Sequence, residues 1–355
     1  MNFRSLIFIA SLFFSISVCA QATYHCVDFN QADFEGSDLL NSDVKGKKII
    51  MIGEFHHWAA NSIVQTELFR HLNKHFGVRH LLIEFGGAEA YLFNQYLETG
   101  DDWYLNHTFS GYGYLENEEF FSSWKRLYEY NLGLDNSKKL IVHGLDFERE
   151  PGLSASLYKL LSAYKNNPQI SGFATSIKIR LDTIGIKRNT KEFIYYLRER
   201  VSALPIPNDE NKKLIEDIIG NDLFFSGSSV GPERDKQMAQ KFLALDTSEE
   251  VYLGQFGFVH TMLDQRNMLT GYLNSLDKYH DKILVISMQY LDLVNTHGNN
   301  LVDNFIKENP ISCPNFIYRI NSSDGEIGKL KGRMDWMFFL RNQKLLELLP
   351  ENRTW

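Results

Sequence analysis

A series of short apolar runs, each bounded by polar residues or glycine, constrains the fold of this chain more than any other feature. The runs are Lys48–Gly53, His80–Phe85, Lys139–Gly144, Val251–Gly254, Lys282–Ser287 and Asn315–Ile320, and Trp336–Leu340 is expected to rejoin them. Most are apolar without alternation, which is typical of strands covered on both faces. Stretches with helical spacing of apolar residues lie between them, such as Ile63–Phe76. This alternation predicts an α/β fold with a mainly parallel β-sheet flanked by helices.

The stretch from about Pro151 to Asn221 differs, because it contains helical patterns and no convincing strand. Its apolar residues form two helical faces, one of Leu153, Leu157, Leu160, Leu161 and Tyr164 and one of Phe193, Tyr196, Leu197 and Val201. We interpret the stretch as an all-helical insertion, or cap, lying over the edge of the sheet. The remaining chain, residues 21–355, is then expected to form a single domain around it.

The first twenty residues have the pattern of a secretory signal peptide. Arg4 precedes an apolar run from Leu6 to Val18, and a small residue, Ala20, precedes the expected cleavage point. The run is too short for a permanent membrane span. Lipidation at Cys19 is the less favoured alternative, because Val18 occupies a position that normally takes a very small residue. We therefore expect an exported protein, periplasmic or secreted, without a membrane span.

Cleavage after residue 20 leaves two cysteines, Cys26 and Cys313. In an oxidising compartment such a pair is compatible with a disulfide, and two free thiols are the open alternative.

The formal net charge of −7 argues against nucleic acid as a partner. A high aromatic content, 14% of residues, suits a small-molecule substrate that is apolar or contains rings.

Ionisable and polar residues follow four of the predicted strands. The first strand continues into Glu54, His56 and His57, the second ends at Glu84, the third is followed by Asp146, and the fourth by Gln255 and His260. Ligands of open parallel sheets bind outside the carboxyl ends of the strands. We therefore predict a site at this edge of the sheet, although a histidine there would also serve to cap a helix.

Two kinds of chemistry suit this set of residues. A carboxylate, Glu54 or Glu84, that is hydrogen-bonded to His57 would fix its tautomer, so that the other ring nitrogen takes a proton from water. Asp146 and His260 are further catalytic candidates, and no cofactor is then needed. Alternatively, the four residues Glu54, His57, Glu84 and His260 would bind a divalent metal that activates water. Residue types alone do not separate these mechanisms.

Other residues are candidates for substrate binding. His56, Arg234 and Gln255 are expected beside the catalytic set, and the aromatic segment that contains Trp103 and Tyr112 would line a pocket or pack against the cap. The segment Gly227–Gly231 fits the Gly-x-Ser-x-Gly pattern around Ser229, but it lacks a convincing strand before it, so we interpret it as a loop.

Four segments resemble the erythromycin esterase family, within the wider group of haem-uptake and Tiki-like proteins. They are Gly53-Glu54-x-x-His57, the strand-terminal Glu84, the Gly144-x-Asp146 turn, and Arg234-Asp235-Lys236-Gln237-Met238-Ala239. The resemblance implies metal-independent hydrolysis of an ester with His57 as base and with Glu54 and Glu84 orienting it or the water. The family's His-Asn-x-His stretch appears here as Gly254-Gln255-Phe256-Gly257, with a histidine displaced to His260, so we expect a substrate other than a macrolide.

The sequence thus predicts an esterase-like hydrolase. The alternatives are a metal-dependent hydrolase or protease of the Tiki-like type, and an exported protein that binds haem or a metal without catalysis.

Overall fold

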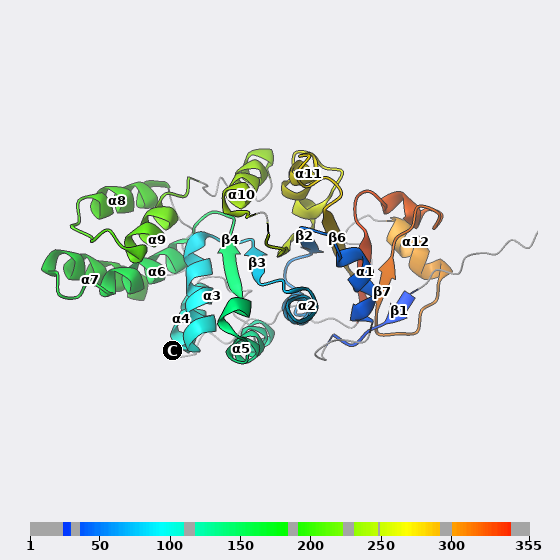
Figure 1. Ribbon diagram of the computed structural model, residues 1–355, viewed down its shortest axis with the longest axis horizontal. Coiled ribbons are helices and arrows are strands. Elements are labelled where there is room, and N and C mark those ends of the chain that lie inside the picture. Colours follow the sequence, from blue (N-terminus) through cyan, green and yellow to red (C-terminus); the bar gives the residue numbers. More distant parts are fainter. Residues whose placement is uncertain are drawn as a thin grey trace, which may run out of the picture.

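The structure, a computed structural model, describes residues 24–29, 36–109, 118–183, 191–222, 231–247, 249–291 and 300–341. Its centre is an eight-stranded sheet with the order β1-β7-β8-β6-β2-β5-β3-β4 (Figure 1). The strands are β1 (Tyr24–Cys26), β2 (Ile49–Glu54), β3 (His80–Ile83), β4 (Ile141–Gly144), β5 (Tyr252–Gly257), β6 (Ile283–Tyr290), β7 (Asn315–Arg319) and β8 (Trp336–Leu340). Only β7 pairs antiparallel, with β1 and with β8. The predicted α/β fold with a mainly parallel sheet is therefore confirmed.

Strand β5 is longer than the sequence predicted. It was expected to end at Gly254, but it continues to Gly257, which pairs with Glu54 of β2. The glycine at 254 does not end the strand, because the parallel partner β2 supplies hydrogen bonds along its whole length. Gln255 therefore lies within a strand and not after one.

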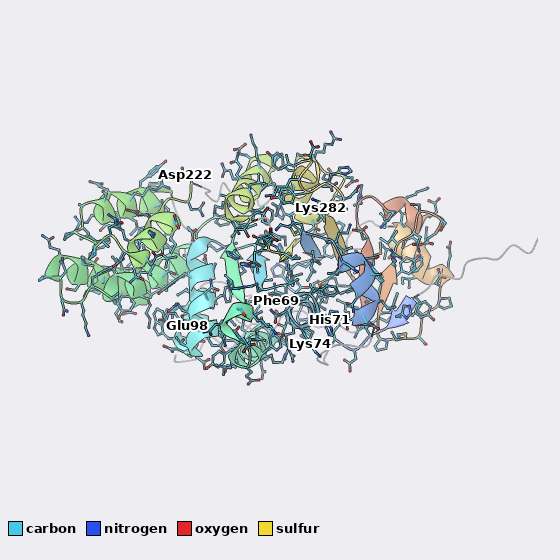
Figure 2. All side chains as sticks on the ribbon, in the orientation of Figure 1. Phe69, His71, Lys74, Glu98, Asp222 and Lys282 are labelled. Atoms are coloured by element: carbon cyan, nitrogen blue, oxygen red, sulfur yellow. A yellow bond between two sulfur atoms is a disulfide. The ribbon has the colours of Figure 1, made fainter. Side chains whose placement is uncertain are left out.

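Alternate residues of the strands face two separate apolar layers. Ile50 and Ile52 of β2 face one cluster, and Ile49 and Met51 face the other. The first layer is covered by α1 (Asn41–Val44), α2 (Ala60–Phe76), α3 (Gly87–Thr99) and α5 (Glu118–Leu132), and the second by α10 (Pro232–Leu245), α11 (Leu269–Asn274) and α12 (Asn300–Glu308). Phe69 of α2, labelled in Figure 2, is fully buried in the first layer. Burying one such side chain contributes roughly 1.5–3 kcal/mol, so these two layers supply the main stabilisation of the sheet.

Four helices occupy the segment in which the sequence predicts an all-helical insertion. They are α6 (Glu150–Ser162), α7 (Pro168–Thr183), α8 (Lys191–Ser202) and α9 (Glu210–Ile219), and they lie together at the β4 end of the sheet (Figure 1). Their apolar faces pack around a third cluster of their own, which includes Leu157, Phe173 and Leu197. Where the chain leaves α9, Asp222 (labelled in Figure 2) pairs with Arg198 at 2.7 Å.

The outer edge of β4 is covered by side chains from two helices. Asn94 of α3 accepts a hydrogen bond from the Val142 N–H at 2.8 Å and donates one to the Val142 carbonyl at 2.9 Å. Asn131 of α5 accepts from the N–H of Leu140 at 2.9 Å. An uncovered strand edge would template pairing with another chain. These two amides satisfy the edge instead, so the sheet ends at β4.

Within the described ranges, no helix has the length and the apolar character that crossing a bilayer requires. The predicted signal peptide, residues 1–20, lies outside the described residues. Of the two alternatives for the cysteines, the structure has the disulfide, because Cys26 is bonded to Cys313 with 5.6 Å between their Cα atoms. This bond is compatible with export.

The disulfide joins residues 287 positions apart and should therefore constrain the unfolded chain. We expect the double substitution Cys26→Ser and Cys313→Ser to lower the free energy of unfolding by about 2–4 kcal/mol, measured by urea denaturation. Reducing the wild-type protein with dithiothreitol should have the same effect. An unchanged unfolding midpoint in both experiments would contradict this account.

Candidate functional site

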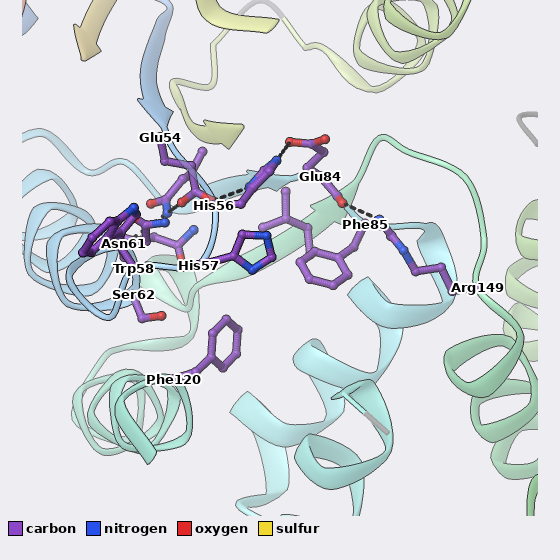
Figure 3. A pocket seen from close by; sticks show the side chains of 13 residues that line it. Glu54, His56, His57, Trp58, Asn61, Ser62, Glu84, Phe85, Phe120 and Arg149 are labelled. Carbon is purple, nitrogen blue, oxygen red and sulfur yellow. Dashed lines mark hydrogen bonds and ion pairs between the residues drawn. The ribbon is translucent and has the colours of Figure 1, made fainter. Parts of the chain in front are cut away.

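The carboxyl ends of three neighbouring strands bring the predicted site residues together. Strands β2, β5 and β3 are adjacent in the sheet, so Glu54 at the end of β2, Gln255 in β5 and Glu84 after β3 line one pocket. Figure 3 shows Glu54 and Glu84 at this edge, with His56 between them. The amide of Gln255 donates hydrogen bonds to the Glu54 carboxylate and to the Asn61 carbonyl. The prediction that these residue types converge at one edge follows directly from the parallel topology.

His56 is the imidazole that contacts both carboxylates. Its Nδ1 lies 2.9 Å from Oε1 of Glu54, and its Nε2 lies 4.0 Å from Oε2 of Glu84. The hydrogen bond with Glu54 is the largest influence on the ring and, against the effect of burial, raises the pKa of His56 to about 9. His56 is therefore a cation at neutral pH, held between two acids. The sequence predicted that His57 would occupy this position.

His57 follows His56 in the turn after β2 and lines the same pocket. Its backbone φ of 76° is in the left-handed region, which a non-glycine residue rarely adopts and which turns the chain sharply after His56. Burial and the positive charge of His56 together lower the pKa of His57 below its ordinary value. The pKa values of the two adjacent histidines are thus displaced in opposite directions. At neutral pH His57 is neutral and His56 is charged.

Two glycines leave room for this arrangement. A Cβ at Gly53 would meet Oγ1 of Thr261 at 2.3 Å, and one at Gly257 would meet Nε2 of His56 at 3.0 Å. Side chains at these positions would displace Thr261 in the turn after β5 or the His56 ring. The first position of the Gly53-Glu54-x-x-His57 segment is therefore a glycine because a larger side chain would clash there.

Both histidines line a pocket of about 110 Å³ (Figure 3). Its apolar wall includes Trp58, Phe85 and Phe120. The polar lining comprises Glu54, His56, His57, Asn61, Ser62, Gln65, Glu84, Arg149 and Gln255. The volume lies below the roughly 300–1,000 Å³ of pockets that enclose a whole drug-sized ligand, so the described walls enclose only a small reacting group.

A buried ion cluster supports the pocket from behind. Arg234 donates to Oε1 of Glu84 at 2.8 Å and forms two hydrogen bonds with Asp146, at 2.7 Å and 2.9 Å. Burial alone would raise the pKa of Glu84, but His260, His56 and Arg234 lower it to about 2. Arg149 adds a contact with Asp146 at 3.4 Å. The cluster keeps Glu84 ionised, and an ionised Glu84 favours the charged form of His56.

His260 reaches Glu84 from the turn after β5. Its Nδ1 lies 2.7 Å from Oδ1 of Asp235, and its Nε2 lies 3.5 Å from Oε1 of Glu84. Burial would lower the pKa of His260, but Asp235 and Glu84 outweigh it and raise the pKa. Because His260 is only 3% exposed, it acts on the pocket through Glu84 and does not line it. The helix motif thus supplies Asp235 as the partner of His260 and Arg234 as the partner of Glu84.

The structure differs from the sequence prediction at some residues, and some predicted residues lie outside the part of the chain that it describes. Trp103 lies on α4 (Asp102–Phe109), stacked on His107 at 4.0 Å and beneath the Lys159 ammonium at 3.9 Å, and it does not line the pocket. Tyr112 and Ser229 lie outside the described residues. Asp235 and Arg149 were not among the predicted site residues. The Arg-Asp motif contained the signal for Asp235, whereas nothing local indicated Arg149.

The alternative ligand set for a metal does not fit this geometry. The guanidinium of Arg234 contacts Glu84 and lies 3.5 Å from Nε2 of His260, so a cation would meet a fixed positive charge among its ligands. In the part of the chain that the structure describes, no group of three or more His, Cys, Asp or Glu side chains is arranged to hold a metal ion.

Fold and site together define an α/β protein with a His/Glu site at the carboxyl ends of its parallel strands. No protein-family model matches the sequence, and no curated protein matches it either. Among solved structures, the chain is similar to a succinoglycan biosynthesis protein, with 13% identity over 91% of this chain and 95% of the other and a TM-score of 0.60.

Two further structures share the fold. A Bacillus cereus protein is 14% identical over 92% of this chain and 97% of its own, with a TM-score of 0.56. An erythromycin esterase variant, EreC in its open conformation, is 13% identical over 92% of this chain and 100% of its own, with a TM-score of 0.58. The fold implied by the sequence resemblance is therefore confirmed. Identities this low show the fold alone.

Because their environments differ, His56 and His57 are expected to titrate at different pH values. In NMR titrations of the ring protons, His56 should titrate at about 9 and His57 below its ordinary value of 6.5. Glu54→Gln should lower the pKa of His56, because it removes the charged hydrogen-bond partner. A higher pKa for His57 than for His56 would disprove the assignment.

Proposed function

We propose that this protein is an esterase-like hydrolase in which His57 removes a proton from water and His56, as a cation, stabilises the developing negative charge. One observation carries the proposal: two adjacent histidines of the same pocket have pKa values displaced in opposite directions. Such a divided pair of titratable groups is the usual arrangement for a general base and a general acid.

The proposed reaction uses groups that line the pocket. Neutral His57 accepts a proton as water attacks the ester carbonyl, and the charged His56 stabilises the oxyanion and then protonates the departing alkoxide. The products are a carboxylic acid and an alcohol, and proton exchange with solvent restores both imidazoles. Glu54 and Glu84 position His56 and maintain its charge, while Gln255 holds the Glu54 carboxylate.

Asp146, Arg234 and His260 contribute through Glu84 in this mechanism. The charges of Arg234 and His260, together with that of His56, hold the pKa of Glu84 at about 2, so it remains ionised wherever the enzyme is folded and active. Asp146 holds Arg234 through two hydrogen bonds. Removing one member of such a buried cluster leaves another charge uncompensated, which typically costs about 3–5 kcal/mol of stability. Substitutions there would therefore lower folding stability and activity together, unlike substitutions of His57.

The substrate in this proposal is a small-molecule ester, of which only the reacting group enters the pocket of about 110 Å³. The likeness to an erythromycin esterase shows the fold alone, and it does not extend to macrolides. We further infer that residues 1–20 are a signal peptide, that the protein acts in the periplasm or outside the cell, and that residues 21–355 form one domain with the helical insertion at about 151–221. The disulfide and the separate apolar cluster of α6–α9 support these inferences.

The proposal predicts a specific loss of activity on substituting His57. With p-nitrophenyl acetate as substrate, His57→Ala should lower kcat/KM by about 10²–10⁴-fold, the usual contribution of a general base, without changing the urea midpoint. The matched control is His280→Ala, since His280 is exposed and precedes β6 at the opposite edge of the sheet. Equal rates in both variants would refute the role of His57.

Dialysis against EDTA should leave this activity unchanged. An activity that is lost on dialysis and restored by zinc or manganese would support the metal-dependent alternative instead. Stoichiometric binding of haem without any turnover would support the binding-protein alternative.

The pH dependence follows from the same pair. The reaction needs neutral His57 and charged His56, so kcat/KM should rise through the lowered pKa of His57 and fall at about 9, giving a bell shape. His56→Gln should reduce the maximum and remove the alkaline limb. An alkaline limb that persists in this variant would assign the acid to another group.

A further inference from the structure

A second hollow, the β4 groove, lies beside the edge strand β4, apart from the His56 pocket. It has a volume of about 970 Å³ and is formed by β4 together with α3, α9 and α10. In Figure 1 these elements surround β4 at the end of the sheet where the cap begins. The lining residues of the β4 groove and of the His56 pocket do not overlap. The groove is at the upper end of the roughly 300–1,000 Å³ typical of ligand pockets.

A row of three titratable side chains leads into the β4 groove, in which the first contact is a charge contact and the second a hydrogen bond. Oε2 of Glu250 lies 3.2 Å from Nε2 of His80, and Nδ1 of His80 lies 2.8 Å from Nε2 of His143. The ring planes of the two histidines are only 18° apart and their centroids are 5.1 Å apart, as expected for an in-plane hydrogen bond between imidazoles. His143 lines the groove, whereas His80 is buried beneath it.

The charge of Glu250 favours one direction for the hydrogen bond between the two rings. Its carboxylate lies 3.2 Å from Nε2 of His80 and favours the tautomer with the proton on that atom, so that Nδ1 of His80 is an acceptor. His143 must donate from Nε2, which leaves a lone pair on its Nδ1. Burial lowers the pKa of both rings, that of His143 to about 4, so both are neutral at pH 7. Among the described residues nothing bonds to Nδ1 of His143, and that atom is not buried.

Most charged groups of the β4 groove already have partners within the protein. Glu148 accepts from the backbone N–H groups of Gly87 and Ala88 at the start of α3. Lys241 donates to the carbonyl of Asp146 at 2.7 Å. Asp222 pairs with Arg198. Asp217 of α9 is the remaining charged residue of the lining, so few charges there are left for a ligand to neutralise.

The remaining lining combines exposed amides with apolar side chains and one aromatic ring. Gln237 and Gln240 of α10 face Tyr91 and Gln95 of α3 across β4. Amide side chains both donate and accept hydrogen bonds, and the lone pair of His143 accepts one more. This set suits a ligand that is uncharged, offers many hydroxyl groups and has apolar faces for the ring and the aliphatic side chains.

We propose that the β4 groove is a second ligand site, which binds a neutral saccharide of a few sugar units with one hydroxyl donating to Nδ1 of His143. Glu250 and His80 are positioning residues of this site, because they orient His143 without touching the ligand. The site is independent of hydrolysis at His57, so either function can fail alone.

Saturation-transfer NMR with maltotriose, cellotriose and triacetylchitotriose tests the proposal, with sialyllactose as the anionic comparison. At least one neutral trisaccharide should bind more tightly than sialyllactose. His143→Phe should weaken that binding by roughly three- to tenfold, the effect of one hydrogen bond. His57→Ala should bind the sugar as the wild type does. Absence of binding for all three neutral sugars, or unchanged binding in His143→Phe, would overturn the proposal.

Two exposed positions on α10 provide a matched pair of variants that do not depend on the folding of His143→Phe. Gln240 lines the β4 groove, while Lys236 lies one turn earlier, exposed and away from it. Gln240→Trp should weaken sugar binding by obstructing the α10 side of the groove, and Lys236→Trp should not affect it. Equal binding by these two variants would exclude the groove. Nitrogen-15 NMR of the imidazoles should find the His143 proton on Nε2, and a proton on Nδ1 would refute the inferred row.

Discussion

The carboxylate of Glu84 is the interaction on which the arrangement of the His56 pocket depends. It accepts a hydrogen bond from the backbone of Gly257 at 2.7 Å, pairs with Arg234, and lies within 4.0 Å of His56 and 3.5 Å of His260. A buried carboxylate is costly unless several partners compensate it. Satisfying Glu84 therefore ties β3, β5, α10 and the turn after β2 into one constellation, and any ligand at the pocket meets that electrostatic framework.

The contrast between His56 and His57 follows from this framework. Both residues belong to one short turn, and the hydrogen bond with Glu54 is the largest influence on His56. On His57, partial burial and the charge of His56 outweigh the charge of Glu54. His56 and His57 are the same residue type and differ in charge only because their surroundings differ.

Glu250, His80 and His143 form a second group of imidazoles and a carboxylate beside the β4 groove. In this group the imidazoles are neutral, whereas His56 is charged. There Glu250 is the acid beside His80, and burial keeps the two rings of His80 and His143 neutral. The charge of the imidazole at each site therefore depends on the balance between burial and the acids around the ring. The α/β scaffold accommodates both sites, because β4 is closed by the amides of Asn94 and Asn131 and leaves its groove open to ligands.

The sequence by itself determined the sheet, the helical cap segment and the edge at which acids and histidines gather. Apolar runs and helical spacing are local properties, and the carboxyl ends of parallel strands share one edge in any such sheet. It did not determine that β5 continues to Gly257, that His56 and not His57 lies between Glu54 and Glu84, or that His80 and His143 pair across 63 positions. These depend on strand register and on backbone direction at single residues. Only tertiary structure decides them, because a shift of one residue exchanges which side chain meets which partner.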